Sequence, residues 1–453
     1  MPTKQDLVAD IVKELTKIQG STTPLVDKDD IFPIPRMIAT GDGRSIIVSK
    51  KIDQLITAIA RRMKDDDLSL ATTFTDADLN TSVRNAFGAA LVQIDLEDEV
   101  NKNAKTVLTN VEVVLRRKVS SLGPCEYAFG CTLFSNDDVA RFEIGPVCFE
   151  TRVKWLDRKA SSGAISKITQ RRVKRAWHGQ KPTKRKTSYD RIREQDILDT
   201  VGACPYVCSI STIGFAAEAG KEKALTAARL ALAAIALRWE TPSKALDGFN
   251  LSFDRNVRLQ KLLTFVPNKI ILAGSKLPHM PHGPYLKPGE WEKEFAANRN
   301  YFAVVGETLE YLLNSTSKAG RQKLSNTLAQ SLLWFHEGCR ETVTLMAIVK
   351  FSASMDALAN GRKASGIRRV INARLGIKDE ATIRPGGPRM KEVINHIYSE
   401  GRSRTIHGTN DKLGYDWTIT RGLAEQFARL CLLSCIDWVG KNPSSDDPGL
   451  LAK

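Results

Sequence analysis

The C-terminal third of the chain carries apolar residues at helical spacing, and this pattern limits the folds that the chain can adopt. Between residues 321 and 360 the apolar positions are Leu324, Leu328, Leu332, Phe335, Val343, Met346, Val349 and Leu358. Such a stripe buries one face of a helix against other helices. Similar patterns occur at residues 291–313 and 391–407 and from about residue 418 onward. We therefore expect four or five helices that pack as a bundle over residues 289–453.

The first 121 residues are expected to form a mainly helical module with one β-hairpin. Apolar stripes with a period of 3.6 residues occur at residues 6–19, 51–63, 76–94 and 103–120. The turn Gly41-Asp42-Gly43 separates two short runs, 36–40 and 44–49, that have strand character. A glycine-containing turn of this kind is typical of a hairpin.

The middle of the chain, residues 122–288, is expected to form an α+β module. Runs rich in β-branched and aromatic residues predict short strands at 127–134, 141–144, 147–155 and 205–213. A helix at 219–239 has so few polar positions that it must be buried on several sides. A basic segment, residues 159–193, interrupts the sheet. The chain is therefore predicted to be α+β and mostly α, with a helical N-terminal module, a small antiparallel sheet and a C-terminal helical bundle.

The net charge of +16 over 453 residues favours a polyanionic partner, nucleic acid first and an anionic membrane second. Cations concentrate in the basic segment, where Asp190 is the single acid between Lys167 and Arg193. Aromatic side chains among cations can stack on unpaired bases while the cations contact phosphates. The candidate nucleic-acid-binding residues are Arg171, Arg172, Lys174, Arg175, Trp177, Lys184, Arg185 and Lys186. The alternative interpretation of this segment is a solvated basic loop.

Neither a membrane span nor a metal site is expected. No run approaches the roughly 20 uninterrupted apolar residues that a span requires, and the N-terminus lacks the features of a signal peptide, so we predict a cytoplasmic protein. The side chains with the closest spacing for a metal are Cys204 with Cys208, Cys431 with Cys435, and His279 with His282. The cysteine pairs lack a matching CxxC-like pair, and the histidines have no acid or thiol beside them. We expect no metal and no cofactor.

Residues 398–408 read Tyr-Ser-Glu-Gly-Arg-Ser-Arg-Thr-Ile-His-Gly and carry the strongest chemical signal in the chain. Arg402 and His407 are separated by four residues at the end of a helical pattern. Arginine can clamp a phosphate through a fork of donors, and histidine exchanges a proton near neutral pH. The segment resembles the motif of the Apea-like branch of the HEPN superfamily, an Arg, four to six residues and a His on the last helices of an all-α domain. The resemblance covers roughly residues 300–440.

The resemblance implies a metal-independent endoribonuclease of the toxin-like or anti-phage defence type. Such an enzyme would cut single-stranded RNA or tRNA as a homodimer formed through the C-terminal bundle. Arg402 would hold the phosphate, and His407 would act as general acid or base while the ribose 2′-hydroxyl attacks it. Asp356 stands where the family often has an acidic residue on the facing helix.

Helix geometry leaves the composition of this site open. Residues five apart in a regular helix are rotated by about 140°. Arg402 and His407 therefore share a face only if the segment bends, for which Gly401 offers a place, or if a second chain completes the site. Ser403 and Arg404 are better placed beside His407, so Arg404 is a rival for the role of Arg402.

A second interpretation assigns the motif a structural role. In that case His407 caps a helix, and Arg402 pairs with Glu400 or Asp411. The chain would then be a non-catalytic scaffold that binds nucleic acid or a nucleotide. Of the other histidines, His396 lies three turns before His407 on about the same face and could line the cleft, whereas His336 is expected in the core.

Overall fold

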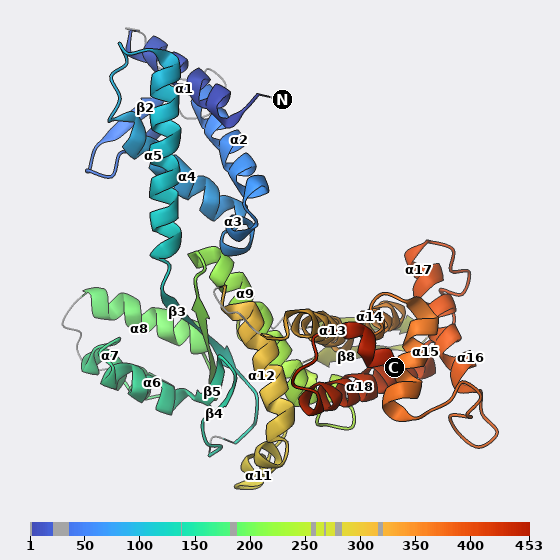
Figure 1. The fold of residues 1–453 in the computed structure, drawn as a ribbon. Helices are drawn as coiled ribbons and strands as arrows, with labels where there is room; N and C mark the ends of the chain where they lie inside the picture. Colours follow the sequence, from blue (N-terminus) through green and yellow to red (C-terminus); the bar gives the residue numbers. More distant parts are fainter. Residues whose placement is uncertain are drawn as a thin grey trace. The chain divides into compact units, whose positions relative to one another are not determined.

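The computed structural model describes residues 2–20, 36–136, 138–181, 188–254, 260–266, 269–276, 283–315 and 320–453 (Figure 1). Its fold class is α+β and mostly α, as predicted. The chain forms two compact units. Unit 1 consists of Met1–Cys125, Thr212–Lys223 and Asn314–Thr316, and unit 2 consists of Glu126–Ser211, Ala224–Leu313 and Ser317–Lys453.

Unit 1 is built from helices around one hairpin. Its helices are α1 Lys4–Gln19, α2 Lys50–Asp66, α3 Leu68–Thr73, α4 Asp76–Leu91 and α5 Val100–Ser120, and the hairpin is β1 Arg36–Ala39 with β2 Ser45–Val48. The side chains of Thr3, Ser49 and Thr75 accept backbone N–H groups at the starts of α1, α2 and α4, which satisfies donors that a helix start leaves unpaired. The predicted helices therefore begin at capping residues that are present in the sequence.

A four-stranded sheet runs through the first part of unit 2. Its strands are β3 Pro124–Cys131, β4 Phe142–Ile144, β5 Val147–Thr151 and β6 Tyr206–Ile213, in the order β3-β6-β5-β4. Strand β5 is antiparallel to both β4 and β6. The predicted strand at 147–155 is too long, because Arg152 already begins a helix and Trp155 uses that helix to reach a small core.

The basic segment folds as helices over the part that the structure describes. Helices α6 Arg152–Ser161, α7 Lys167–Trp177 and α8 Ser188–Val201 lie between β5 and β6 in the chain. Their apolar side chains Trp155, Leu156, Val173, Ile197 and Val201 form a small core with Val207 of β6. The interpretation as a solvated loop is therefore wrong for these helices, because their buried faces hold them in place.

The remaining helices of unit 2 pack around a single hydrophobic core. They are α9 Ala217–Ala236, whose first residues belong to unit 1, α10 Pro242–Gly248, α11 Glu290–Ala297, α12 Arg299–Leu313, α13 Gln322–Arg340, α14 Thr344–Leu358, α15 Lys363–Leu375, α16 Met390–Asn395, α17 Arg404–Ile406 and α18 Thr418–Lys441. Strands β7 Gln260–Val266 and β8 Lys269–Lys276 pair with each other as a two-stranded antiparallel sheet. The core joins Phe149 of the sheet, Leu230 of α9 and Phe351 of α14, so the predicted modules 122–288 and 289–453 share it.

The apolar pattern at 321–360 forms two helices instead of one. Helix α13 ends at Arg340, where Glu341 adopts an extended conformation, and α14 starts at Thr344. The two helices then pack on each other through reciprocal hydrogen bonds, in which the hydroxyls of Ser331 and Ser354 each donate to the other residue's carbonyl at 2.9 Å. The turn lets both apolar faces enter the same core.

Close packing between α12 and the β4–β5 turn generates a stability prediction. A Cβ atom on Gly306 would lie 2.8 Å from the backbone nitrogen of Gly145, which has a φ of +56°. We expect Gly306→Ala to lower the free energy of unfolding by about 1–3 kcal/mol, because neither backbone can give way. The measurement is urea unfolding of the full chain followed by circular dichroism.

Gly422 in α18 provides the matched control. A Cβ there meets no atom within 4 Å, so Gly422→Ala should raise the free energy of unfolding by up to about 1 kcal/mol through helix propensity alone. Equal effects of the two substitutions would contradict the packing argument.

Candidate functional site

The motif segment is an interrupted helix. Helix α16 continues into a π-helical stretch, His396–Ser403, which is followed by the short helix α17 and by His407. Gly408 has a φ of +69°, as expected for a glycine that ends a helix. π-Helical turns bond residues five apart and occur frequently at functional sites. The π-helical stretch includes Gly401, where the sequence offered a place for a bend.

Gly401 has a packing role in this segment. A Cβ on Gly401 would lie 2.7 Å from Cγ2 of Ile348 in α14, so only glycine lets the two backbones approach this closely. The neighbouring side chains Ile397 and Tyr398 are buried against the same core. The π-helical stretch is therefore fixed against α14.

Arg402 lies on an aromatic ring. Its guanidinium carbon is 4.8 Å from the centroid of the Tyr398 ring. The Tyr398 hydroxyl donates to Oδ2 of Asp356 at 3.4 Å, and Asp356 in turn accepts the backbone N–H of Lys363 at 2.8 Å. Burial, together with the nearby Asp356, raises the pKa of Tyr398. Among the described residues no carboxylate forms an ion pair with Arg402, and its buried Nε has no hydrogen-bond acceptor.

Arg404 takes the acidic partners that the structural interpretation assigned to Arg402. Its Nη1 lies 3.2 Å from Glu400 and 3.3 Å from Asp411. Glu400 is also 3.3 Å from Lys412. The pairing of Arg402 with Glu400 or Asp411 is therefore wrong, because Arg404 occupies both carboxylates.

His407 is exposed at the end of the segment. Its backbone N–H donates to the carbonyl of Ser403 at 3.0 Å, and Ser403 is half-buried. In the part of the chain that the structure describes, no hydrogen bond joins the His407 ring to Arg402, Ser403 or Arg404. A single chain thus presents the imidazole and the guanidinium without linking them.

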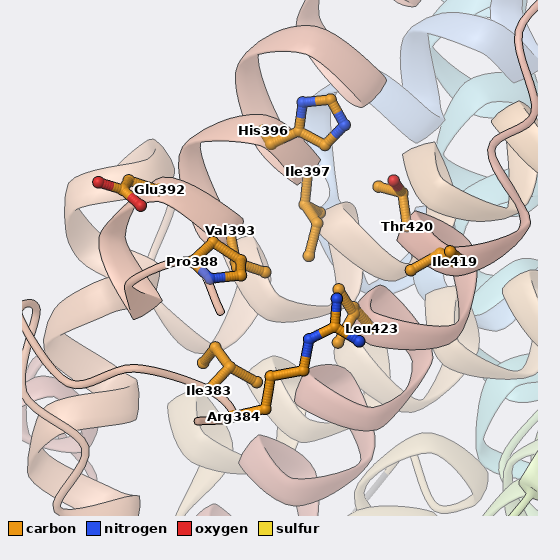
Figure 2. Close-up of a pocket in the computed structure, with 10 residues that line it drawn as sticks. All are labelled: Ile383, Arg384, Pro388, Glu392, Val393, His396, Ile397, Ile419, Thr420 and Leu423. Atoms are coloured by element: carbon orange, nitrogen blue, oxygen red, sulfur yellow. The ribbon is translucent and has the colours of Figure 1, made fainter. Parts of the chain in front are cut away.

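A pocket of about 380 Å³ opens beside the first residue of the π-helical stretch (Figure 2). His396 lies at one end of it, and its ring stacks on Trp417 with centroids 5.3 Å apart. The guanidinium of Arg384 extends toward Leu423, whereas Glu392 points away. Most of the other lining side chains are apolar: Ile383, Pro388, Val393, Ile397 and Ile419. The sequence had placed His396 near a cleft but gave no sign of Arg384 or Trp417, which reach this region from other segments.

Two of the predicted nucleic-acid-binding residues, Arg171 and Arg175, form an exposed cationic stripe together with Lys167. Lys167, Arg171 and Arg175 recur every four residues along α7 and are exposed. None of the three forms an ion pair with an acidic side chain among the described residues. The Nε of Arg171 donates to the carbonyl of Lys167, and the Nε of Arg175 donates to the carbonyl of Lys181. We refer to Lys167, Arg171 and Arg175 as the α7 stripe.

The other predicted nucleic-acid-binding residues lie elsewhere. Lys174 pairs with Asp157 at 2.6 Å, and Trp177 lies under the Arg152 guanidinium at 4.9 Å. Lys184, Arg185 and Lys186 lie outside the described residues. The prediction for Arg172 is wrong, because its side chain is only 3% exposed and its Nε lies 2.6 Å from the equally buried Glu194.

The thiols and the core histidine show no sign of ligand binding. All eight cysteines are unpaired, and burial raises the pKa of Cys131 and of Cys435 to about 12. His336 is in the core, as expected, and burial lowers its pKa. His279 and His282 lie outside the described residues. Within the described ranges no three potential metal ligands gather in one place.

None of the described helices combines the length and the apolar character that a membrane crossing requires. Comparison with protein-family models, with curated proteins and with solved structures gives no match to this chain.

The buried pair of Arg172 and Glu194 leads to a stability prediction. We expect Arg172→Met to lower the free energy of unfolding by about 3–5 kcal/mol, because it removes the buried guanidinium that pairs with a buried carboxylate. The control is the double substitution Arg172→Met with Glu194→Leu, which removes both charges and should recover most of the loss. Urea unfolding measures both variants, and a double variant as unstable as the single one would show that loss of this charge pairing is not the cause.

Proposed function

We propose that this protein is a metal-independent endoribonuclease of the HEPN type that cuts single-stranded RNA or tRNA. The observation that carries the proposal is the different pairing of two neighbouring arginines. Arg404 is neutralised by Glu400 and Asp411, which leaves Arg402 as the motif cation without a carboxylate in the described structure. An arginine that retains its donors can bind a phosphate.

Arg402 is suited to stabilise the charge that develops on the phosphorane oxygens. The Tyr398 ring lies beneath its guanidinium, and Asp356 accepts the hydrogen bond that orients the ring. A cation held over an aromatic face is restrained without losing its N–H donors. This arrangement aims the donors of Arg402 without neutralising its charge.

His407 is suited to transfer the proton in the same reaction. As the 2′-hydroxyl attacks the adjacent phosphorus, the imidazole accepts the hydroxyl proton or, in its charged form, donates a proton to the departing 5′-oxygen. Its exposure leaves the ring open to RNA.

The proposed enzyme acts as a homodimer, because one chain does not join the two groups. Large apolar side chains stand exposed around the motif: Ile406, Leu413, Tyr415 and Ile419. An exposed apolar group of this kind favours contact with another protein surface. A second copy that covers it would bring two motif segments close together, as in the family that the motif resembles.

The proposed role is that of a toxin-like or anti-phage effector in the cytoplasm, with RNA as its substrate. The α7 stripe offers cations to the RNA backbone, and the pocket beside His396 is wide enough for an unpaired base. A non-catalytic scaffold that binds nucleic acid or a nucleotide is the second candidate. It is favoured by the α7 stripe together with the separation of His407 from Arg402.

Substitutions in the motif test catalysis. We expect the purified protein to cleave single-stranded RNA in EDTA, and His407→Ala to reduce the cleavage rate by about 10²- to 10⁴-fold through loss of the proton-transferring group. Arg402→Ala should reduce the rate by about 10²- to 10³-fold. Cleavage is measured on a labelled RNA in gels.

Arg404→Ala is the matched control, because it removes a neighbouring arginine whose charge is already compensated. It should leave most of the activity intact. Unchanged cleavage by His407→Ala would refute the mechanism, and absence of cleavage by the parent protein, combined with RNA binding, would favour the scaffold.

Charge reversal on α7 tests RNA binding separately. We expect Arg171→Glu with Arg175→Glu to weaken RNA affinity and to reduce the slope of log affinity against log salt by roughly 0.7 for each lost phosphate contact. The control, Lys13→Glu with Lys17→Glu on α1, changes the net charge equally on another helix. Fluorescence anisotropy over a salt series measures both, and equal losses would show that net charge, and not the α7 stripe, governs binding.

A further inference from the structure

Unit 1 contains a polar pocket that the proposed nuclease does not use. Its volume is about 450 Å³. The polar side chains that line it come from β1, α2 and α4: Arg36, Asp53, Gln54, Thr57, Arg61, Asn80 and Arg84. Three arginines and one carboxylate thus line a single pocket.

Helical spacing builds this pocket from two facing helices. Asp53, Thr57 and Arg61 recur every four residues along α2, and Asn80 and Arg84 do so along α4. Residues four apart lie on the same side of a helix. The hydroxyl of Thr57 lies 2.9 Å from the carbonyl oxygen of Asp53 in its own helix and 3.3 Å from Oδ1 of Asn80 in the facing helix, so it shares its proton between α2 and α4 at the pocket.

The charges in the pocket do not cancel. Asp53 lies 3.4 Å from Nη1 of Arg36 and 3.2 Å from Nη2 of Arg84, so one carboxylate holds two guanidiniums in place. Three arginines (+3) and one aspartate (−1) give the lining a formal charge of +2. Arg61 has neither an ion pair nor a hydrogen bond within the described residues. The lining therefore favours an anionic ligand.

The side chains of Arg84 and Asn80 also provide hydrogen-bond donors in the pocket. Nη2 of Arg84 donates to the carbonyl of Met37 at 3.0 Å, but its buried Nε has no acceptor among the described residues. The side-chain NH2 group of Asn80 is a further donor. Guanidinium and amide N–H groups match the oxygens of a phosphate, and a phosphate monoester carries close to two charges at neutral pH.

We propose that this pocket binds a small phosphate monoester of the size of a nucleoside monophosphate. Its volume exceeds the needs of a bare phosphate and falls in the usual range of roughly 300–1,000 Å³ for small-molecule sites. Asp53 orients two of the arginines, and Arg61 supplies a cation that forms no ion pair within the described residues. The proposal does not depend on the nuclease activity, since every residue it uses lies in unit 1.

The test is isothermal titration of the full-length protein with inorganic phosphate and with each of the four nucleoside 5′-monophosphates at constant ionic strength. The parent nucleosides, which lack the phosphate, serve as the ligand control. We expect the monophosphates to bind and the nucleosides to bind roughly tenfold more weakly or not at all. Affinity should also fall as the pH drops below about 6, where the phosphate loses its second charge.

Two neighbouring arginines provide the matched variants. Arg61→Gln should weaken monophosphate binding by roughly tenfold or more, because it removes a charged donor from the pocket. Arg62→Gln changes the next residue, whose guanidinium donates to the carbonyl of Pro2 and does not line the pocket, and should leave the affinity unchanged. Circular dichroism shows whether each variant is folded.

Three results would overturn the proposal: no binding of any monophosphate at millimolar concentration, equal affinities for the parent and Arg61→Gln, or equal losses for Arg61→Gln and Arg62→Gln. Preferential binding of a 5′-phosphorylated RNA over the free monophosphates would assign the phosphate to an RNA end instead of a small molecule. His407→Ala should bind the monophosphates as the parent does. A failure of the nuclease proposal is therefore distinguishable from a failure of this one.

Discussion

The candidate site depends on the packing of one short stretch against α14. Ile348 lies directly under Gly401, where a single methyl group would already clash, and Asp356, two turns farther along α14, accepts the hydroxyl of Tyr398. Helix α14 is itself fixed to α13 by the reciprocal hydrogen bonds of Ser331 and Ser354. Close-packed interiors adjust poorly to added volume. The position of Arg402 is therefore set by buried contacts rather than by the exposed end of the segment.

Periodicity predicted most of the secondary structure, because burial imposes a period of two on strands and about 3.6 on helices. It could not predict the break after Arg340, since the apolar spacing continues through it and the turn is determined by the core that both helices share. The π-helical stretch was equally invisible. Only the close approach of Gly401 to Ile348 explains why the chain is held there, and that contact joins residues far apart in sequence.

The roles of individual cations were harder to predict than the elements that carry them. Arg172 looked like one more member of a basic run, but it lies on the buried side of α7, where Glu194 from α8 neutralises it. Arg402 and Arg404 are two residues apart but have different neighbours in the fold. Arg404 pairs with Glu400 and Asp411, whereas Arg402 lies on an aromatic ring. Sequence spacing alone cannot assign such partners.

The cations that make up the excess positive charge therefore have different roles in the molecule. Some cations, such as Arg172, are internal counterions, and others, such as Arg404, are held by surface carboxylates. Free binding capacity remains where acids are too few, as on the α7 stripe and in the pocket around Asp53. A carboxylate in that pocket does not weaken the case for an anion, because it orients two guanidiniums while leaving a third uncommitted. The distribution of acids, more than the number of bases, determines where a polyanion or a phosphate can bind.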